Sequence, residues 1–190
     1  MVPLKCREAS PEIIASCRQG DRDALRVLYD TYKDRVYSLS LYFFHGDESV
    51  AADVTQQVFL KLITSVPQFK GNAEFSTWLY RLVVNACQDA ARRRKSAALA
   101  TDRSWLEEFA SPCTQEDDYT RAQNAHCVRG AVSELPPKLR MAVLLRYFDD
   151  LSYEEMAQVL NCSMGTVASR LSRGHKILAE RLKGLMGARK

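Results

Sequence analysis

Residues 151–178 predict two helices separated by a tight break, and this pattern constrains the fold more than any other part of the sequence. Ser152 and Glu155 have the spacing of a capping box, which marks the start of the first helix. Residues 161–162 interrupt the apolar pattern, and Ser163 is a suitable N-cap for the second helix. The stretch therefore predicts a helix-turn-helix unit.

The second of these helices has one apolar and one cationic face. The apolar residues recur at i, i+4, i+7 and i+11, as a buried stripe requires; they are Val167, Leu171, Gly174 and Leu178. The opposite face consists of Thr166, Ser169, Arg170, Arg173 and Lys176. A cationic second helix suits insertion into the major groove of DNA. A helical hairpin with a solvated basic face is the alternative.

Charge is unevenly distributed along the chain. The 190 residues are enough for one domain or two small ones, and 27 Lys and Arg stand against 23 Asp and Glu. Basic residues dominate positions 161–190, whereas acidic residues dominate positions 96–127. This distribution indicates contact with a polyanion by separate parts of the chain.

The first half of the chain is predicted to be helical. Ser10 and Asp21 are suitable N-caps for two successive helices, and a proline directly follows Ser10. The second of these helices is expected to bury one apolar face, formed by Leu25, Leu28, Tyr29, Tyr32, Val36 and Leu39. Apolar residues at helical spacing predict a third helix from Glu48 to Ser65. A fourth predicted helix follows the loop at 70–74 and ends at Lys95. The pattern favours an all-α packing.

The predicted fourth helix carries a polar stripe in addition to its apolar one. Its members share one face of the helix and are Arg81, Asn85, Gln88, Arg92 and Lys95. Three aromatic residues flank the glycine-containing loop just upstream: Phe69, Phe75 and Trp78. Aromatic rings can stack on unpaired bases while cations hold phosphates, so the stripe favours nucleic-acid binding. For Phe75 and Trp78 taken singly, a place in the core is the preferred interpretation.

Three stretches, in the expected order and spacing, resemble the extracytoplasmic-function (ECF) class of bacterial sigma factors. They are ADVTQQVFLKLI at 52–63, FKGNAEFSTWLYRLVVNACQDAARRR at 69–94, and ELPPKLRMAVLLRYFDDLSYEEMAQVLNCSMGTVASRLSRGHKIL at 134–178. The resemblance implies an all-α fold of two small helical domains, sigma-2 at residues 1–95 and a sigma-4 helix-turn-helix domain at 120–190. Residues 96–119 are predicted to form a flexible acidic linker. The implied function is that of a dissociable initiation subunit, which binds core RNA polymerase, directs it to −35 and −10 promoter elements and assists DNA melting.

The resemblance also implies three functional surfaces. Core RNA polymerase is expected to bind a polar row beside two exposed apolar side chains, formed by Asp53, Gln56, Gln57, Phe59, Leu60 and Lys61. The −10 element, with a flipped base captured by the loop, is expected to bind Lys70, Asn72, Phe75, Trp78, Arg81, Asn85, Gln88 and Arg92. The −35 element is expected to bind Thr166, Ser169, Arg170, Arg173 and Lys176.

Some positions depart from the usual pattern of this family. Thr55 stands where an aliphatic residue is common, and Val84 where alanine or arginine is frequent. Ala168 and His175 replace the Lys or Arg often found in the second helix of the helix-turn-helix. The last two departures remove cations from the surface that is expected to contact DNA.

A polymerase-independent helix-turn-helix regulator would also explain the C-terminal end. Such a regulator would pair that end with a sensing domain and bind as a dimer. A sigma factor acts as one copy, so no obligate homo-oligomer is expected. Its expected partners are core RNA polymerase, promoter DNA and an anti-sigma factor.

Neither an enzyme nor a metal or cofactor site is predicted. The three histidines are far apart, and no nucleophile, metal or phosphate-loop motif is present. No signal peptide or membrane-spanning run is apparent, which predicts a cytoplasmic protein without membrane insertion. The six cysteines lack CxxC spacing and are expected to be buried apolar residues rather than zinc ligands or a disulfide framework.

Overall fold

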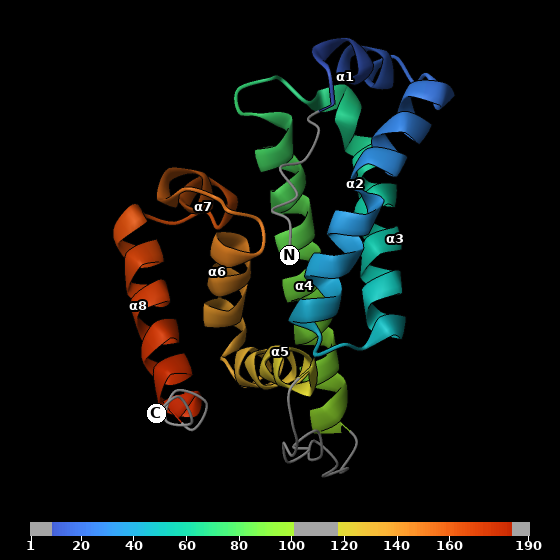
Figure 1. Cartoon of the computed structure of the whole chain (residues 1–190). Coiled ribbons are helices and arrows are strands. Elements are labelled where there is room, and N and C mark those ends of the chain that lie inside the picture. Colours follow the sequence, from blue (N-terminus) through green and yellow to red (C-terminus); the bar gives the residue numbers. More distant parts are fainter. Residues whose placement is uncertain (1–8, 101–117, 184–190) are drawn as a thin grey trace.

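The computed structural model describes residues 9–100 and 118–183, which form helices and connecting turns without any strand (Figure 1). The first range contains α1 (Pro11–Arg18), α2 (Arg22–Phe43), α3 (Glu48–Ser65), a short 3-10 helix η1 (Val66–Gln68) and α4 (Phe75–Ala100). The second contains α5 (Asp118–Ser133), α6 (Pro137–Tyr147), α7 (Tyr153–Val159) and α8 (Met164–Arg181). We name α1–α4 the N-terminal unit and α5–α8 the C-terminal unit. The prediction of an all-α fold is confirmed.

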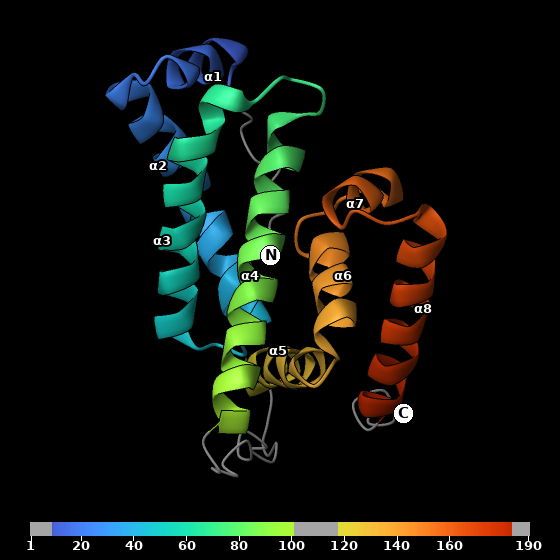
Figure 2. The ribbon, with the colours of Figure 1, turned by 180° about the vertical axis from the view of Figure 1, so that it is seen from behind.

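In the N-terminal unit, α2, α3 and α4 lie side by side and α1 covers one end of them (Figures 1 and 2). Both predicted caps are present: the Ser10 hydroxyl accepts a hydrogen bond from Ile13 N–H (3.4 Å), and Asp21 accepts one from Asp23 N–H (2.8 Å). The largest fully buried side chains of this unit are Phe43, Leu28, Leu39, Leu62, Val54, Val58 and Val66. Helix α4 continues to Ala100, beyond its predicted end at Lys95.

In the C-terminal unit, α7 and α8 form the predicted helix-turn-helix beside α6 (Figure 1). The capping box is present, since Ser152 N–H donates to the Glu155 carboxylate (2.6 Å) and Glu155 N–H donates to the Ser152 hydroxyl (3.2 Å). Asn161 turns the chain with a φ of 47°, a left-handed conformation that asparagine tolerates better than most residues. Ser163 caps α8 by accepting from Thr166 N–H (3.2 Å).

Helix α8 packs against α6 at Gly174, which is buried. A Cβ atom at this position would lie 3.1 Å from Val143 Cγ2 and 4.0 Å from Leu139 Cβ. The small residue in the predicted buried stripe therefore allows the two helices to pack closely.

The N-terminal and C-terminal units pack against each other. Helix α6 and helix α5 contact α2, and helix α7 contacts α4. Figure 2 shows α6 and α7 on the side of α4 away from α3. Buried apolar residues from both units form one continuous core cluster. The sequence predicted two helical domains but not this contact between them.

Two aromatic residues are placed differently from the prediction. Phe59, expected to be exposed on α3, is only 6% exposed, and Tyr29, expected on the buried face of α2, is 45% exposed. Their rings meet edge to face, with centroids 4.7 Å apart. The Tyr29 ring thus covers Phe59 and itself takes the exposed position.

The four cysteines in the described residues only partly match the prediction of buried apolar residues, and Cys6 and Cys113 lie outside those residues. Cys17 and Cys87 are buried and free, and burial raises the pKa of the Cys87 thiol to about 12. Cys162 is partly exposed in the break between α7 and α8. Cys127 on α5 is disulfide-bonded, so the prediction is wrong for these two residues.

Candidate protein-binding groove and nucleic-acid interface

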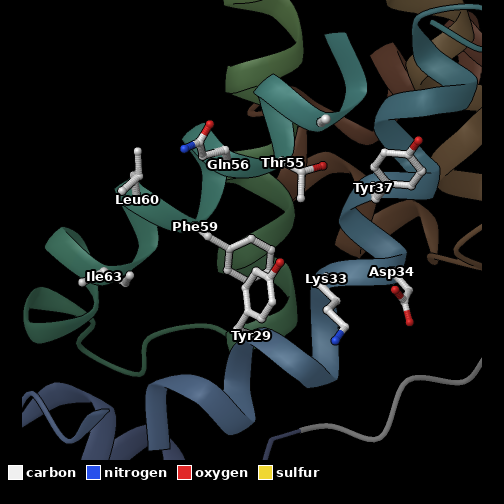
Figure 3. A pocket seen from close by; sticks show the side chains of 10 residues that line it. Tyr29, Lys33, Asp34, Tyr37, Thr55, Gln56, Phe59, Leu60 and Ile63 are labelled. Atoms are coloured by element: carbon white, nitrogen blue, oxygen red, sulfur yellow. The ribbon is translucent and has the colours of Figure 1, made fainter. Parts of the chain in front are cut away.

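A surface groove of about 440 Å³ lies between α2 and α3 (Figure 3). It is lined by Tyr29, Lys33, Asp34 and Tyr37 of α2 and by Ala52, Thr55, Gln56, Phe59, Leu60 and Ile63 of α3. Leu60 is 59% exposed and Ile63 is 48% exposed. Exposed apolar side chains beside polar groups are typical of a protein-binding surface.

Half of the residues predicted for polymerase binding line this groove, namely Gln56, Phe59 and Leu60. The others are exposed on α3 outside it: Asp53, Gln57 and Lys61. Gln57 accepts a hydrogen bond from Arg93 of α4 (2.9 Å), which links α3 to the neighbouring helix. The unusual Thr55 is buried, and its hydroxyl donates to the Ala51 carbonyl (2.7 Å). The buried hydroxyl of Thr55 therefore has a hydrogen-bond acceptor within its own helix.

The loop before α4 rests on a cluster of aromatic rings. Phe69, Phe75 and Trp78 lie with ring centroids 5.3–5.5 Å apart in all three pairs. Phe75 is only 6% exposed, as expected of a core residue. Lys70 and Asn72 are exposed in the loop, and Gly71 between them has a φ of 72°, which favours glycine. The rings thus support the loop, while its polar side chains face outward.

The predicted polar stripe on α4 is accessible along most of its length. Arg81, Asn85, Arg92 and Lys95 are exposed, and Gln88 is partly buried. Arg92 forms an ion pair with Asp89 (2.5 Å). Arg81 donates from Nε to the main-chain carbonyl of Gln158 in α7 (2.7 Å). The start of the stripe therefore contacts the C-terminal unit.

The polar face of α8 contains the residues predicted for −35 binding. Arg173 and Lys176 are exposed, and Thr166, Ser169 and Arg170 are partly exposed. The Ser169 hydroxyl donates to the Thr166 carbonyl (2.9 Å) and lies 3.5 Å from Arg173 Nη2. His175 is also exposed, and its Nε2 lies 2.9 Å from the hydroxyl of Tyr147, an exposed residue at the end of α6. Tyr147 therefore adjoins this face, although the sequence did not point to it.

A buried carboxylate links the two units. Asp149 follows α6, and its Oδ1 accepts hydrogen bonds from Arg35 Nε of α2 (2.5 Å) and from the Tyr80 hydroxyl of α4 (2.8 Å). Arg35 Nη2 also donates to the Asp149 carbonyl (3.1 Å). Burial raises the pKa of the Asp149 carboxyl, and the hydrogen bonds and charge of Arg35, together with Tyr80, act in the opposite direction. No sequence signal joins these residues, which are far apart along the chain.

A buried guanidinium forms a second link. Arg140 of α6 donates to the Phe43 carbonyl at the end of α2 (2.6 Å) and contacts His45 Nε2 (2.8 Å). It also donates to carbonyls within its own unit, those of Val132, Ser133 and Leu135. Burial lowers the pKa of Arg140 to about 10, so the side chain stays charged at neutral pH. A lone cation in the apolar run 139–145 was the available sequence signal.

Within residues 9–100 and 118–183, no helix is long and apolar enough to cross a membrane. The same ranges contain no group of three or more His, Cys, Asp or Glu side chains placed to share a metal ion.

Family models and relatives agree on the identity of both units. The model of Sigma-70 region 2 matches residues 28–97, and that of Sigma-70, region 4 matches residues 125–178. The chain is 31% identical over 180 residues to the ECF RNA polymerase sigma factor SigW of Bacillus subtilis, covering 90% of this chain and 96% of that protein. It is 32% identical over 183 residues to the ECF RNA polymerase sigma-E factor of Escherichia coli K12, covering 92% of this chain and 94% of that protein.

Two solved structures share the fold. The sigma factor RpoE in complex with the anti-sigma factor NepR from Bartonella quintana has a TM-score of 0.68 at 22% identity, over 83% of this chain and 96% of that chain. CnrH in complex with the cytosolic domain of CnrY has a TM-score of 0.66 at 21% identity, over 96% of this chain and 100% of that chain. Because both sigma-70 regions are matched in order and the relatives span most of its length, the chain belongs to the ECF sigma factors, which recognise promoters and bind RNA polymerase.

Proposed function

We propose that the two units of this sigma factor divide promoter recognition between them. A sigma-2 domain at residues 1–95 binds core RNA polymerase and recognises and melts the −10 element. A sigma-4 domain at residues 120–190 recognises the −35 element, and residues 96–119 link the two. The region matches at 28–97 and 125–178 support this division. A polymerase-independent regulator is not favoured, because both sigma-70 regions are present.

The groove between α2 and α3 is our candidate for the polymerase contact. The observation that supports it best is the exposure of Leu60 and Ile63 beside the polar Gln56, a combination that a protein partner can bury. Asp53, Gln57 and Lys61 extend the contact along α3, whereas the buried Phe59 supports the groove from within.

The exposed loop and the stripe of α4 are our candidate for the −10 contact. Lys70 and Asn72 take the flipped base and its backbone, and Phe75 and Trp78 hold the loop in place. Flipping a base costs a few kcal/mol, and the contacts that the loop makes with the flipped base must offset this cost. The residues proposed to hold the backbone and adjacent duplex are Arg81, Asn85, Gln88 and Arg92.

The cationic face of α8 is our candidate for the −35 contact. Its exposed Arg173 and Lys176 and its partly exposed Arg170 suit phosphates or guanine edges. Thr166 and Ser169, near the N-terminal end of α8, are placed for base or phosphate contacts. Since Ala168 and His175 supply no fixed charge, these five residues provide the main contacts.

We infer that the chain acts in the cytoplasm, without catalytic activity or a cofactor of its own. We also propose an anti-sigma factor as a protein partner. The two proteins of similar fold are both described in complexes, the sigma factor RpoE with the anti-sigma factor NepR and CnrH with the cytosolic domain of CnrY. The groove between α2 and α3 is an apolar surface that such a partner could cover.

Gel filtration with core RNA polymerase tests the groove assignment. Wild-type chain should co-elute with the polymerase, and Leu60→Ala combined with Gln56→Ala should weaken binding by about tenfold or more, as expected for a central apolar anchor. Glu48→Gln, an exposed change at the start of the same helix and outside the groove, is the matched control. Unchanged co-elution of the double variant would refute the assignment, and failure of the wild type to bind polymerase would refute the function.

A further inference from the structure

A tyrosine and a histidine form a polar pair on the surface beside the cationic face of α8. Tyr147, the last residue of α6, is 61% exposed, and His175 is exposed on α8. The Tyr147 hydroxyl lies 2.9 Å from His175 Nε2, and the two ring centroids are 5.6 Å apart. Helix α6 lies alongside α8 (Figure 1), so the pair joins the end of one helix to the exposed side of the other.

The pair is next to residues that we assign to promoter DNA. His175 directly precedes Lys176 and lies two positions after Arg173, and both cations are exposed. It is in the C-terminal half of α8 (Met164–Arg181). In helix-turn-helix proteins the N-terminal residues of the second helix reach base edges, whereas its C-terminal end can meet the DNA backbone. His175 is therefore placed for a phosphate and not for a base.

The hydrogen bond with Tyr147 determines which group the imidazole offers to a ligand. A neutral imidazole has one donor and one acceptor nitrogen. When the Tyr147 hydroxyl donates to Nε2, the proton of the neutral ring is on Nδ1. Within the described residues, the His175 ring has no second hydrogen bond or ion pair. Its Nδ1–H can therefore donate to a phosphate oxygen, the group that receives most hydrogen bonds from DNA-binding proteins.

We propose that His175 donates from Nδ1–H to a backbone phosphate of −35 DNA, and that Tyr147 is a positioning residue that fixes the tautomer and orientation of the ring. This proposal rests on the −35 assignment of α8 and adds to it a contact without charge. A ring that is already ordered loses less side-chain entropy on binding. A neutral donor also neutralises no phosphate charge, so the contact adds affinity without adding to the salt dependence.

Holoenzyme titrations at several salt concentrations test the pair. The probe is a promoter duplex that the wild-type holoenzyme selects from a pool with randomised −35 and −10 elements. The variants are Tyr147→Phe, His175→Ala and the double variant, and Lys176→Ala is the reference for a cationic contact. Tyr42→Phe is the matched control, because it removes a hydroxyl from a partly exposed ring on α2, in the N-terminal unit. Circular dichroism checks that each variant is folded.

We expect His175→Ala to weaken promoter binding by about three- to tenfold, as for one lost hydrogen bond, with an unchanged slope of affinity against salt. Lys176→Ala should flatten that slope. Tyr147→Phe should weaken binding by about two- to threefold, the entropy of ordering one ring, and Tyr42→Phe should have no effect. When position 175 is alanine, Tyr147→Phe should add no further loss, because it acts only through the imidazole.

Three results overturn the proposal: wild-type binding by His175→Ala, a flatter salt dependence for that variant, or additive losses in the double variant. Arg173→Ala and Lys176→Ala check the −35 assignment separately. If neither of them weakens binding, the assignment of α8 to −35 DNA is refuted. If both weaken it while His175→Ala does not, only the proposed pair is refuted.

Discussion

Alanine at Gly174 should destabilise the C-terminal unit, whereas alanine at Gly165 in the same helix should stabilise it. Both substitutions gain helix propensity, worth up to about 1 kcal/mol. At Gly165 the nearest atom to the new Cβ is Ser163 Oγ at 3.9 Å, an ordinary contact. At Gly174 the new Cβ lies 3.1 Å from Val143 Cγ2, so α8 or Val143 must move. Such overpacking costs about 1–3 kcal/mol.

The free energy of unfolding should therefore differ between the two variants by about 1–3 kcal/mol, because the shared propensity gain cancels. Urea unfolding followed by circular dichroism measures this difference. Val143→Ala removes the atom that the new Cβ meets, so it should cost less stability in Gly174→Ala than in the wild type. Equal stabilisation by alanine at the two glycines would show that α6 and α8 are not closely packed here and would refute the reasoning.

Three further predictions concern a cap, a histidine and the DNA contacts. Ser152→Ala removes one side of the capping box and should lower the free energy of unfolding by about 0.5–2 kcal/mol in urea titrations. Desolvation of the His45 ring, then the charges of Arg140 and Arg94, lowers the pKa of His45 to about 4 from 6.5. The folded chain therefore binds fewer protons than the unfolded chain between these values, and stability should fall as pH drops from 6.5 towards 4. His45→Asn should reduce this fall. Arg170→Ala should relax −35 sequence preference, whereas Lys176→Ala should weaken binding evenly and flatten its salt dependence in holoenzyme titrations.

Different results would contradict each of these. A normal unfolding midpoint for Ser152→Ala would mean that the start of α7 is held by packing alone. An unchanged pH profile for His45→Asn would assign the acid loss to carboxylates elsewhere. Uniform losses for both −35 variants would make Arg170 a second phosphate contact and leave base reading to Ser169 or Arg173.

Features governed by neighbouring residues could be predicted from the sequence. The caps at Ser10, Asp21 and Ser163 and the capping box at Ser152 form between residues a few positions apart, so local spacing determines them. The range of α3, Glu48–Ser65, was predicted from apolar residues at helical spacing, which is also a local signal. The helix-turn-helix followed from these local signals.

Features that depend on distant packing could not be predicted. The exposure of Tyr29 and the burial of Phe59 result from how α2 meets α3, and both residues fit either side of an amphipathic helix. The partners Arg35 and Asp149 are brought together only by the contact between units. Charged residues at such positions look like ordinary surface residues in a sequence, since nothing local indicates their burial.

The two polar links between the units differ in the kind of acceptor that they use, and this affects how they can evolve. Arg35 and Tyr80 meet a side chain, Asp149, so a change at one position can be compensated at another and the positions should covary among relatives. Arg140 donates to carbonyls, including that of Phe43, which every amino acid at that position would supply. Selection for second-site suppressors should therefore recover compensating side chains for the first link. For the second, it should recover none at the carbonyl positions, such as Phe43, and compensation there should instead involve the side chain at position 45, which Arg140 also contacts.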